Sequence, residues 1–485
     1  MTQQRNEQES EGQLVANRYN RQELIKGWNQ GKIRDAYVAV IGSGPLANFT
    51  SASLVSLGFG NVEIYDDAHH DKSNDGEFLL SLAGKRDSKV EALEEILSRI
   101  NPLVRVKGVQ TRINSQPLAQ ILGNPSVIIE VTNDSQSQAT ALEYGQSRKV
   151  PVVIAVADSV RGEFYVRFPN KRDKTQIQLD RYKGQHQGAI PSEVLGGIIT
   201  EEVRKIVMPF SKSEKPVNAL SYSVAYPQRF NGEDKLNIND ASLGDRRVLI
   251  VGAGALGNFA GIGLALAGVG EIDVLDFDTV ETTNLNRQLL FYDAVGDEKS
   301  KALAKKLKTI NPKLRIRGLT GKLDESYASQ FRAKENRPDL ILDCVDNFGT
   351  RAIVNYFAVR YGIPLVSGGT SPSSGQVVAY RQGESACLDC KLSVDKALGK
   401  ERTSHSCIYA AQPSVIMTNE VVGGLMVAEA RAILAPQSYG SHIRKMLRYD
   451  STNPARAGLV GGDNPCDCER GPIKEWLKEV ERKAK

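Results

Sequence analysis

One stretch of this chain, residues 248–288, constrains its fold more than any other. It opens with the apolar run Val248–Val251, and a second apolar run, Ile272–Leu275, ends at Asp276. Between them, a segment rich in glycine and alanine begins with the spacing G-x-G-x-x-G, made by Gly252, Gly254 and Gly257. This order predicts a strand, a glycine turn, a helix and a second strand ending in an acid, the nucleotide-binding crossover of doubly wound α/β domains.

The glycines at these positions have separate physical tasks. Gly252 permits the tight turn, Gly254 lets a phosphate approach the backbone, and Gly257 lets the helix and the strand lie close together. The Asp276 carboxylate can accept hydrogen bonds from ribose hydroxyls. By itself, the motif fits a nicotinamide-dependent oxidoreductase as well as other nucleotide-binding enzymes.

Polar residues after the second strand narrow the choice. They are Asp278, Asn284, Arg287, Gln288, Lys299, Asp346 and Asn347. A hydride-transfer enzyme does not need this set of cations and amides, whereas an enzyme that holds a triphosphate does. The series D-F-D-x-V-E-x-x-N-L-N-R-Q, followed by L-D-C-V-D-N, resembles the ubiquitin-activating superfamily, which includes the MoeB/ThiF enzymes that adenylate sulfur-carrier proteins.

The same pattern occurs earlier in the chain, at a constant offset of 210 residues. The matched positions are Gly42 and Gly252, Gly58 and Gly268, Asp66 and Asp276, Lys89 and Lys299, and the Ile-Asn-Pro triplets at 100–102 and 310–312. A constant offset over this length indicates two copies of one fold. We therefore predict an α/β protein with two tandem Rossmann-like, doubly wound domains that form a pseudo-twofold dimer.

The two copies differ where chemistry is expected. After Asp66 the Asn/Arg/Gln set is missing, and alignment of Val131-Thr132-Asn133 with residues 345–347 puts Thr132 in the place of Asp346. The first copy is therefore predicted to be an inactive adenylation-like domain. The expected organisation is a disordered tail (1–15), the inactive domain (16–210), a linker that could hold a small element (211–247), the active domain with a catalytic cysteine loop and a zinc site (248–470), and a C-terminal helix (471–485).

The resemblance also implies roles for individual residues. Arg21, in the segment R-Y-N-R-Q, is expected to reach across the interface to the ATP phosphates of the second half. Arg287 and Lys299 are expected to clamp the phosphates, and Asp346 to hold Mg²⁺. Asn284 is also expected to face the phosphates, and Gln288 and Asn347 are expected to contribute to nucleotide binding, Asn347 at its border, while the role of Asp278 stays open.

Four of the six cysteines form two pairs. They are Cys387 and Cys390, spaced C-x-x-C, and Cys466 and Cys468, spaced C-x-C. In MoeB-like proteins two C-x-x-C pairs bind one structural zinc, and four thiolates suit tetrahedral Zn²⁺. The second pair departs from that spacing, and a redox pair or plain thiols are the alternatives. Cys344, at the end of an apolar strand, is expected to be a small buried residue.

The remaining cysteine, Cys407, follows a polar, charged stretch that is typical of a loop. By the resemblance, this position carries the nucleophile in family members that have no separate cysteine domain. We expect Cys407 to begin a helix, whose N-terminus lowers a thiol pKa, with His405 two residues away. A capping or core cysteine is the alternative.

Bulk properties exclude other classes of function. The 485-residue chain is 41% hydrophobic and 25% charged, and its net charge of +5 is too small to predict nucleic-acid binding. No apolar run approaches the roughly 20 residues that a membrane span requires. The polar N-terminus lacks the apolar core of a signal peptide, so a cytoplasmic location is expected.

Together these features predict an enzyme that uses Mg-ATP to adenylate the C-terminal glycine of a ubiquitin-like protein. The acyl group would pass to Cys407 as a thioester and then to a conjugating enzyme. A first alternative is an adenylate-only activator of a sulfur-carrier protein or peptide. Further alternatives are an NAD(P)-binding oxidoreductase and a binding scaffold, which the retained Arg287, Lys299 and Asp346 disfavour.

Overall fold

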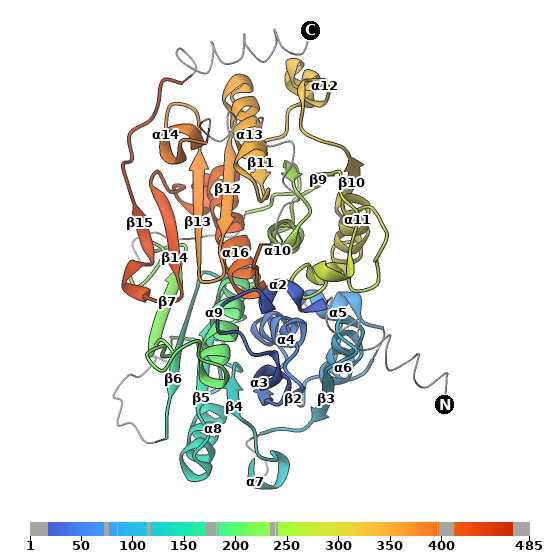
Figure 1. The fold of residues 1–485 in the computed structure, drawn as a ribbon, viewed down its shortest axis with the longest axis vertical. Helices are drawn as coiled ribbons and strands as arrows, with labels where there is room; N and C mark the ends of the chain where they lie inside the picture. The colour runs from blue at the N-terminus through green and yellow to red at the C-terminus, as the bar shows by residue number, and fades with distance from the viewer. Residues whose placement is uncertain are drawn as a thin grey trace.

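A computed structural model describes most of the chain, in two halves joined along one interface (Figure 1). The described residues are 18–71, 77–84, 86–113, 118–169, 181–182, 184–232, 238, 241–394, 396 and 412–468. The predicted tail at 1–15, the predicted helix at 471–485, His405 and Cys407 lie outside these residues.

The described part of the first half forms a seven-stranded sheet in the order β3-β2-β1-β4-β5-β6-β7. Strands β3 to β5 run parallel, and β6 and β7 add antiparallel strands at one edge. The strands are β1 (Tyr37–Ile41), β2 (Asn61–Asp66), β3 (Arg105–Gln110), β4 (Val127–Glu130), β5 (Val152–Ala157), β6 (Arg161–Arg167) and β7 (Ala219–Ser223). The helices are α2 (Asn20–Glu23), α3 (Gln30–Arg34), α4 (Pro45–Leu57), α5 (Phe78–Leu82), α6 (Lys89–Ile100), α7 (Leu118–Ile121), α8 (Ser135–Arg148) and α9 (Ala189–Val207).

The described part of the second half repeats this plan with one more strand, in the order β10-β9-β8-β11-β12-β13-β14-β15. The strands are β8 (Arg247–Val251), β9 (Glu271–Asp276), β10 (Arg315–Thr320), β11 (Leu340–Asp343), β12 (Leu365–Thr370), β13 (Ser374–Tyr380), β14 (Met446–Asp450) and β15 (Gly458–Val460). The helices are α10 (Ala255–Leu266), α11 (Lys299–Ile310), α12 (Glu325–Ala328), α13 (Phe348–Tyr361), α14 (Leu388–Leu392), α16 (Ile416–Leu434) and α17 (Pro436–Tyr439). The central parallel strands are apolar runs buried on both faces, as parallel sheets require.

The predicted fold class, two tandem Rossmann-like α/β domains, is confirmed, and the repeat extends to the elements. Strands β1 and β8 start 210 residues apart, at Tyr37 and Arg247. From β4 and β11 to β6 and β13 the offset is 213, since Val127 and Leu340 begin the first of these pairs, and for α9 and α16 and for β7 and β14 it is 227. The strand pairing agrees, since Ile41 pairs with Glu130 and Val251 pairs with Asp343.

The segment 211–247, expected to be a linker that could hold a small element, does hold one. Residues 219–223 form β7, which pairs with β6 at the edge of the first sheet. The side chains of Leu220 and Tyr222 point into the first half's core. The apolar side chains of Leu220 and Tyr222, two positions apart, are the strand signal, but the run is too short to stand out in a polar segment.

The two halves meet through four helices, α4 and α9 from the first half and α10 and α16 from the second, near the middle of Figure 1. The equivalent helices α9 and α16 pack against each other, as a pseudo-twofold arrangement requires. Glycines allow this close approach: a Cβ on Gly197 would lie 2.6 Å from the Met417 carbonyl oxygen. One continuous buried cluster contains side chains from both halves, so the interface is part of the core.

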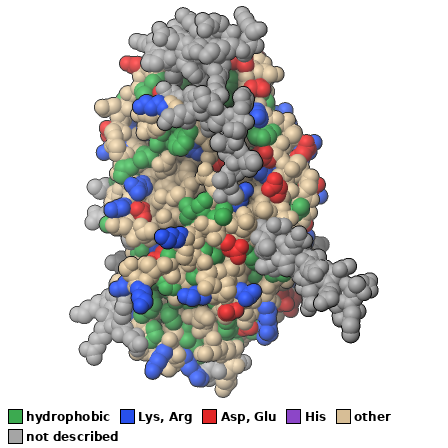
Figure 2. Space-filling model, in the orientation of Figure 1, with side chains coloured by type: hydrophobic (Ala, Val, Ile, Leu, Met, Phe, Trp, Pro, Cys, Tyr) green, Lys and Arg blue, Asp and Glu red, His purple; other side chains and the backbone are tan. Residues whose placement is uncertain are grey.

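Figure 2 shows basic and acidic side chains intermixed over one face of the molecule. Of the helices in the described part of the chain, none has the length and apolar character needed to cross a membrane.

Candidate active site

In the turn between β8 and α10, two of the glycines stand where a side chain would collide with the backbone. Gly252 has φ +97°, and a Cβ there would lie 2.8 Å from the Cys344 carbonyl oxygen. A Cβ on Gly257 would lie only 2.1 Å from the Gly252 carbonyl oxygen. Around Gly254, by contrast, the nearest such atom is the Gln288 amide nitrogen at 4.0 Å. The turn is therefore open at its centre, where a phosphate could approach the backbone at the start of α10.

Asp276 braces this turn from the end of β9. Its two carboxylate oxygens accept hydrogen bonds from the backbone N–H groups of Ala253, at 2.6 Å, and Asp278, at 2.8 Å. Burial raises the pKa of the Asp276 carboxyl. Each oxygen keeps a second lone pair, so the carboxylate can still accept from a ribose hydroxyl.

Arg287 and Arg21 bring two guanidinium groups from opposite halves to this edge of the sheet. Burial, and next the charge of Arg21, lower the pKa of Arg287 to about 10. Arg287 is held by neutral acceptors, because its Nη1 donates to the Thr283 carbonyl at 2.8 Å and to the Asn286 side chain at 2.9 Å. The buried Nε of Arg21 has no hydrogen-bond partner among the described residues. Two cations held near each other without a paired acid favour an anionic ligand.

Lys299, the first residue of α11, lies at the same edge and is buried. Its Nζ forms an ion pair with Asp278 Oδ2 at 2.9 Å, and its backbone N–H donates to the Asp278 carbonyl. Asp278, whose role the sequence left open, is thus the partner of the predicted clamp. In the first half, Lys89 instead pairs with Glu77 at 2.7 Å.

The amides near the turn are placed differently from one another. Asn284 is buried, and its side-chain oxygen accepts from the Glu281 N–H at 2.9 Å, so it caps a short helical turn. The side-chain oxygen of Gln288 is buried without a partner in the described part of the chain. Gln288 therefore has unused hydrogen-bonding capacity directly beside the open glycine turn.

Asp346 and Asn347 follow β11 and border the glycine turn from the other side. Asp346 is exposed, and a Cβ on Gly252 would lie 3.2 Å from the Val345 nitrogen just before it. The Asn347 side chain accepts from the Thr350 N–H at 2.8 Å and so caps α13. An exposed carboxylate at the rim of this open turn has the donor chemistry that Mg²⁺ uses in proteins.

Two buried groups near the site were missed from the sequence. Asn258 ties the turn to the segment that carries Arg287: its amide nitrogen donates to the Ala253 and Gly254 carbonyls, and its oxygen accepts from the Leu290 N–H. Asp343, fully buried, receives the Ser367 hydroxyl at 2.7 Å and lies 3.7 Å from Arg351. The sequence did carry a signal for Asn258, because an asparagine also stands at position 48, at the offset of the repeat, and makes equivalent hydrogen bonds.

The first half's glycine turn is filled by a side chain of the same half. The side-chain oxygen Oε1 of Gln187 accepts from the Leu46 N–H at 3.0 Å, and its side-chain nitrogen Nε2 donates to the Val131 carbonyl at 2.6 Å. That oxygen would lie 3.0 Å from a Cβ on Gly44, the counterpart of Gly254. The space beside Gly254 is open in the second half, and the equivalent space beside Gly44 in the first half therefore holds the side-chain amide of Gln187.

The residue that replaces Asp346 in the first half is Asn133, and the expected match with Thr132 is wrong by one position. With Glu130 equivalent to Asp343, Asn133 stands where Asp346 does. The Asn133 side chain is occupied by the backbone of Ala157, which it contacts at 2.7 and 3.1 Å. The three-residue length difference before β11 caused the mismatch, since nothing in the local sequence reveals where it falls.

Cys387, Cys390, Cys466 and Cys468 are brought together, with their sulfur atoms all within 4.8 Å of one another. A tetrahedral zinc with Zn–S bonds of about 2.3 Å needs sulfur atoms roughly 4 Å apart, so the cluster fits a metal of this kind. Cys344 is buried, as expected, and burial raises the pKa of its thiol well above the ordinary value. Residues 397–411, with Cys407 and His405, lie outside the described residues, and α16 begins at Ile416.

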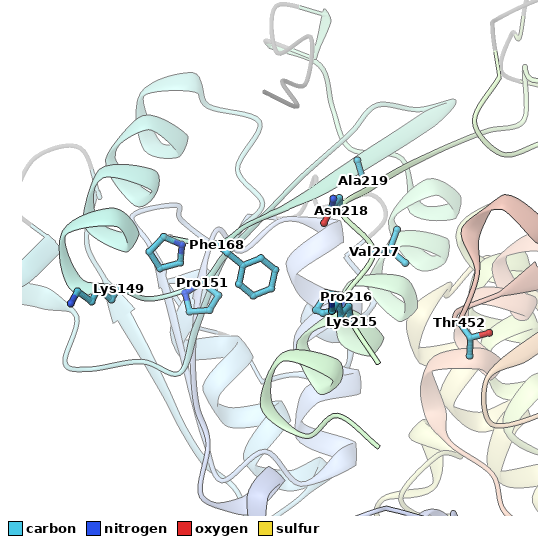
Figure 3. Close-up of a pocket in the computed structure, with 10 residues that line it drawn as sticks. Lys149, Pro151, Phe168, Lys215, Pro216, Val217, Asn218, Ala219 and Thr452 are labelled. Carbon is cyan, nitrogen blue, oxygen red and sulfur yellow. The ribbon is translucent and has the colours of Figure 1, made fainter. Parts of the chain in front are cut away.

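A surface groove of about 890 Å³ lies away from this site, mostly on the first half, with Thr452 of the second half at its edge (Figure 3). It is lined by Lys149, Pro151, Phe168, Pro169, residues 215–219 and Thr452. None of the predicted site residues lines it.

Comparison with known proteins agrees with the repeat. The model of the ThiF family matches residues 18–213 and 227–468. The molybdopterin-synthase adenylyltransferase of Escherichia coli (strain K12) is 36% identical over 226 residues, which cover 46% of this chain and 83% of the relative. The sulfur carrier protein adenylyltransferase of Thermus thermophilus is 37% identical over 245 residues, which cover 48% and 86%.

Among solved structures, that of E. coli MccB with ATP aligns with a TM-score of 0.39 and 23% identity, over 46% of this chain and 65% of that one. Because this score is low, the assignment rests on the family model and the two sequence relatives. Each half of the chain matches the family model separately, and the relatives match about half of the chain. The chain belongs to the ThiF family, within the E1-like MoeB–ThiF superfamily, as the sequence pattern indicated.

Proposed function

We propose that the second half of this protein uses ATP to adenylate the C-terminal glycine of a ubiquitin-like or sulfur-carrier protein. The observation that carries the proposal is the open turn at Gly254, with Gln288 beside it and Arg287 next in the chain. Arg21 of the opposite half is near enough for its charge to act on Arg287. The relatives named above are adenylyltransferases, one of them of a sulfur carrier protein, which supports the same reaction class.

In the proposed reaction, a carboxylate oxygen of the carrier's C-terminus attacks the α-phosphorus of ATP. A new O–P bond forms, the bond to the bridging oxygen of the β-phosphate breaks, and pyrophosphate leaves with that oxygen. Arg287, Arg21 and Lys299 offset the negative charge on the phosphate oxygens, and backbone N–H groups at the start of α10 contribute as well. Asp276 orients the ribose, while Asn284, Gln288 and Asn347 border the nucleotide.

Two metals belong to the proposal. Asp346 would hold Mg²⁺ together with ATP, where the ion neutralises phosphate charge. The four-cysteine cluster would hold a structural Zn²⁺. The cluster joins α14 to the segment after β15, so a metal there would fix the end of the described chain to the body.

A second step extends the proposal beyond adenylation. The thiolate of Cys407 attacks the acyl carbon of the adenylate, a thioester forms, and AMP leaves. A cysteine of a conjugating enzyme would then accept the acyl group. The adenylate-only alternative ends at the first step, and the names of the adenylyltransferase relatives favour it.

Intact-mass analysis of the full chain with Mg-ATP and a ubiquitin-like protein ending in glycine, taken from the same genome, separates these readings. We expect AMP and pyrophosphate, and an adduct on the wild type that reductant removes. Cys407→Ala should lose the adduct, while Cys344→Ala, which removes a buried thiol, should keep it.

Release of pyrophosphate with no adduct on the chain, and with the AMP still bonded to the carrier, would support the adenylate-only alternative. Turnover unaffected by Arg287→Ala would contradict the proposed site altogether. A carrier that lacks its terminal glycine is the substrate control, and it should release no pyrophosphate.

A further inference from the structure

Arg287 is connected to the inactive half by a path of buried amides. Asn286, fully buried, accepts from Arg287 Nη1 at 2.9 Å and donates through its Nδ2 to the Gln22 side-chain oxygen, also at 2.9 Å. Gln22, fully buried in α2 of the first half, donates to the Leu57 carbonyl at 3.0 Å and to Gln30 at 2.7 Å. The path therefore runs from the end of α4 in one half to the guanidinium in the other.

This path fixes the guanidinium in one orientation without neutralising it. A side-chain amide has one donor end and one acceptor end, so the bond from Asn286 to Gln22 forces the Asn286 oxygen toward Arg287. Both bonds that hold Arg287 use Nη1. Within the described part of the chain, its Nη2 and Nε have no partner and remain available to a ligand.

We propose that Gln22 and Asn286 form a positioning relay through which the inactive half orients the Arg287 guanidinium toward the ATP phosphates. The inference rests on the proposed function, since it assigns these residues to the same site. Neither amide touches the nucleotide in this scheme. The relay is distinct from Arg21, the neighbour of Gln22, which would contact the phosphates itself.

The alternative is that Gln22 and Asn286 only hold the two halves together. Removing either amide would then lower stability but would not act through Arg287. The two readings differ in additivity: if Asn286 works through Arg287, its removal should cost nothing further once Arg287 is gone.

The test is equilibrium binding of Mg-ATP to the full chain by titration calorimetry. We expect Asn286→Ala and Gln22→Ala each to weaken binding about tenfold, the size of one lost bond to a charged group. The double variant Asn286→Ala/Arg287→Ala should bind no more weakly than Arg287→Ala alone. If Gln22→Ala does not fold, Asn286→Ser, which is a smaller change, still tests the relay.

Asn48→Ala is the matched control. Asn48 is a buried asparagine with three backbone hydrogen bonds, but it lies at the first half's filled turn. Its variant should bind Mg-ATP within about twofold of the wild type, a difference below about 0.4 kcal/mol.

Wild-type affinity in Asn286→Ala, or a loss that adds fully to that of Arg287→Ala, overturns the relay and leaves the proposed function intact. A wild-type chain that does not bind Mg-ATP overturns both, because the relay would then have nothing to orient.

Discussion

The two cations predicted to hold the phosphates are restrained in different ways. Arg287 donates its hydrogen bonds to neutral oxygens and forms no ion pair among the described residues, whereas Lys299 is paired with Asp278. A phosphate that binds Lys299 must therefore compete with a half-exposed carboxylate, while Arg287 is ready for an anion. Lys89, the repeat equivalent of Lys299, pairs with Glu77 beside a turn that Gln187 already fills.

This difference predicts opposite results for equivalent substitutions. Lys299→Ala should lower ATP-dependent pyrophosphate release by about 100-fold or more, as loss of a group that stabilises transition-state charge does. Lys89→Ala should leave it within a few-fold. Steady-state rates with saturating carrier protein measure both, and equal losses in the two variants would mean that the inactive half is wrongly assigned.

At the residue scale, the sequence predicted positions whose chemistry is local. Gly252 and Gly257 are required by a turn that the motif itself specifies, and their steric surroundings agree. Gln187 and Gln22 were not foreseeable, because each acts on a turn or loop more than 100 residues away in the chain. A lone glutamine carries no signal of its distant partner.

Among the elements, helices α9 and α16 carry equivalent buried acids at the centre of the interface. Glu193 and Glu420 are both fully buried, and three of their four carboxylate oxygens have no hydrogen-bond partner among the described residues. Ser53 of α4 donates to the fourth. Burial, and for Glu193 the nearby Glu420, raise the pKa of each carboxyl well above its ordinary value.

Stability should therefore fall as pH rises. A glutamate in the unfolded chain loses its proton near pH 4.3, whereas the folded carboxyl keeps it to a higher pH. Between these two values, rising pH therefore stabilises the unfolded state relative to the folded state. Glu193→Gln keeps the shape without the titration. Its melting temperature should exceed that of the wild type at pH 8, and the difference should shrink toward pH 4. A variant that is equally destabilised at every pH would contradict a neutral Glu193.

The cysteine cluster joins elements that are distant in the chain, α14 and the segment after β15. We expect one zinc per chain by elemental mass spectrometry, and about a tenth or less of that in Cys468→Ser after dialysis, since three thiolates bind the ion less tightly than four. The matched change Cys344→Ser removes a buried thiol outside the cluster and should leave the zinc content unchanged. A wild type purified without zinc, and indifferent to chelator in thermal unfolding, would refute the metal.

On the scale of the whole molecule, the repeat predicted the architecture because offsets between motifs survive even where side chains diverge. That the two halves pair through α9 and α16 was harder to predict from the sequence. It depends on glycines such as Gly197, whose role is seen only where the two helices cross. Strand β7 likewise forms where it can pair with β6 at the edge of the sheet, and its own sequence has no strong strand pattern.

The filled turn in the first half predicts one nucleotide per chain. Titration of the wild type with Mg-ATP should give a stoichiometry of about one, because only the second half combines an open turn with free cations. Two equivalents per chain would show that Gln187 leaves its turn when nucleotide is present. Gln187→Gly is the informative companion variant, because it opens the first half's turn. That turn still has Asn133 in place of Asp346 and lacks a counterpart of Arg287, so we expect it to bind ATP without high affinity.

A glutamine lodged at Gly44 also changes how the protein responds to changing ATP supply. Twin sites that share one interface can influence each other, so that occupancy of one alters the other's affinity. Here a side chain of the protein fills one of the two sites. No second nucleotide then binds, so there is no second binding event that could change the affinity of the first. Saturation should follow a simple hyperbola with a Hill coefficient of about one, so activity rises in proportion to ATP when it is scarce and has no threshold.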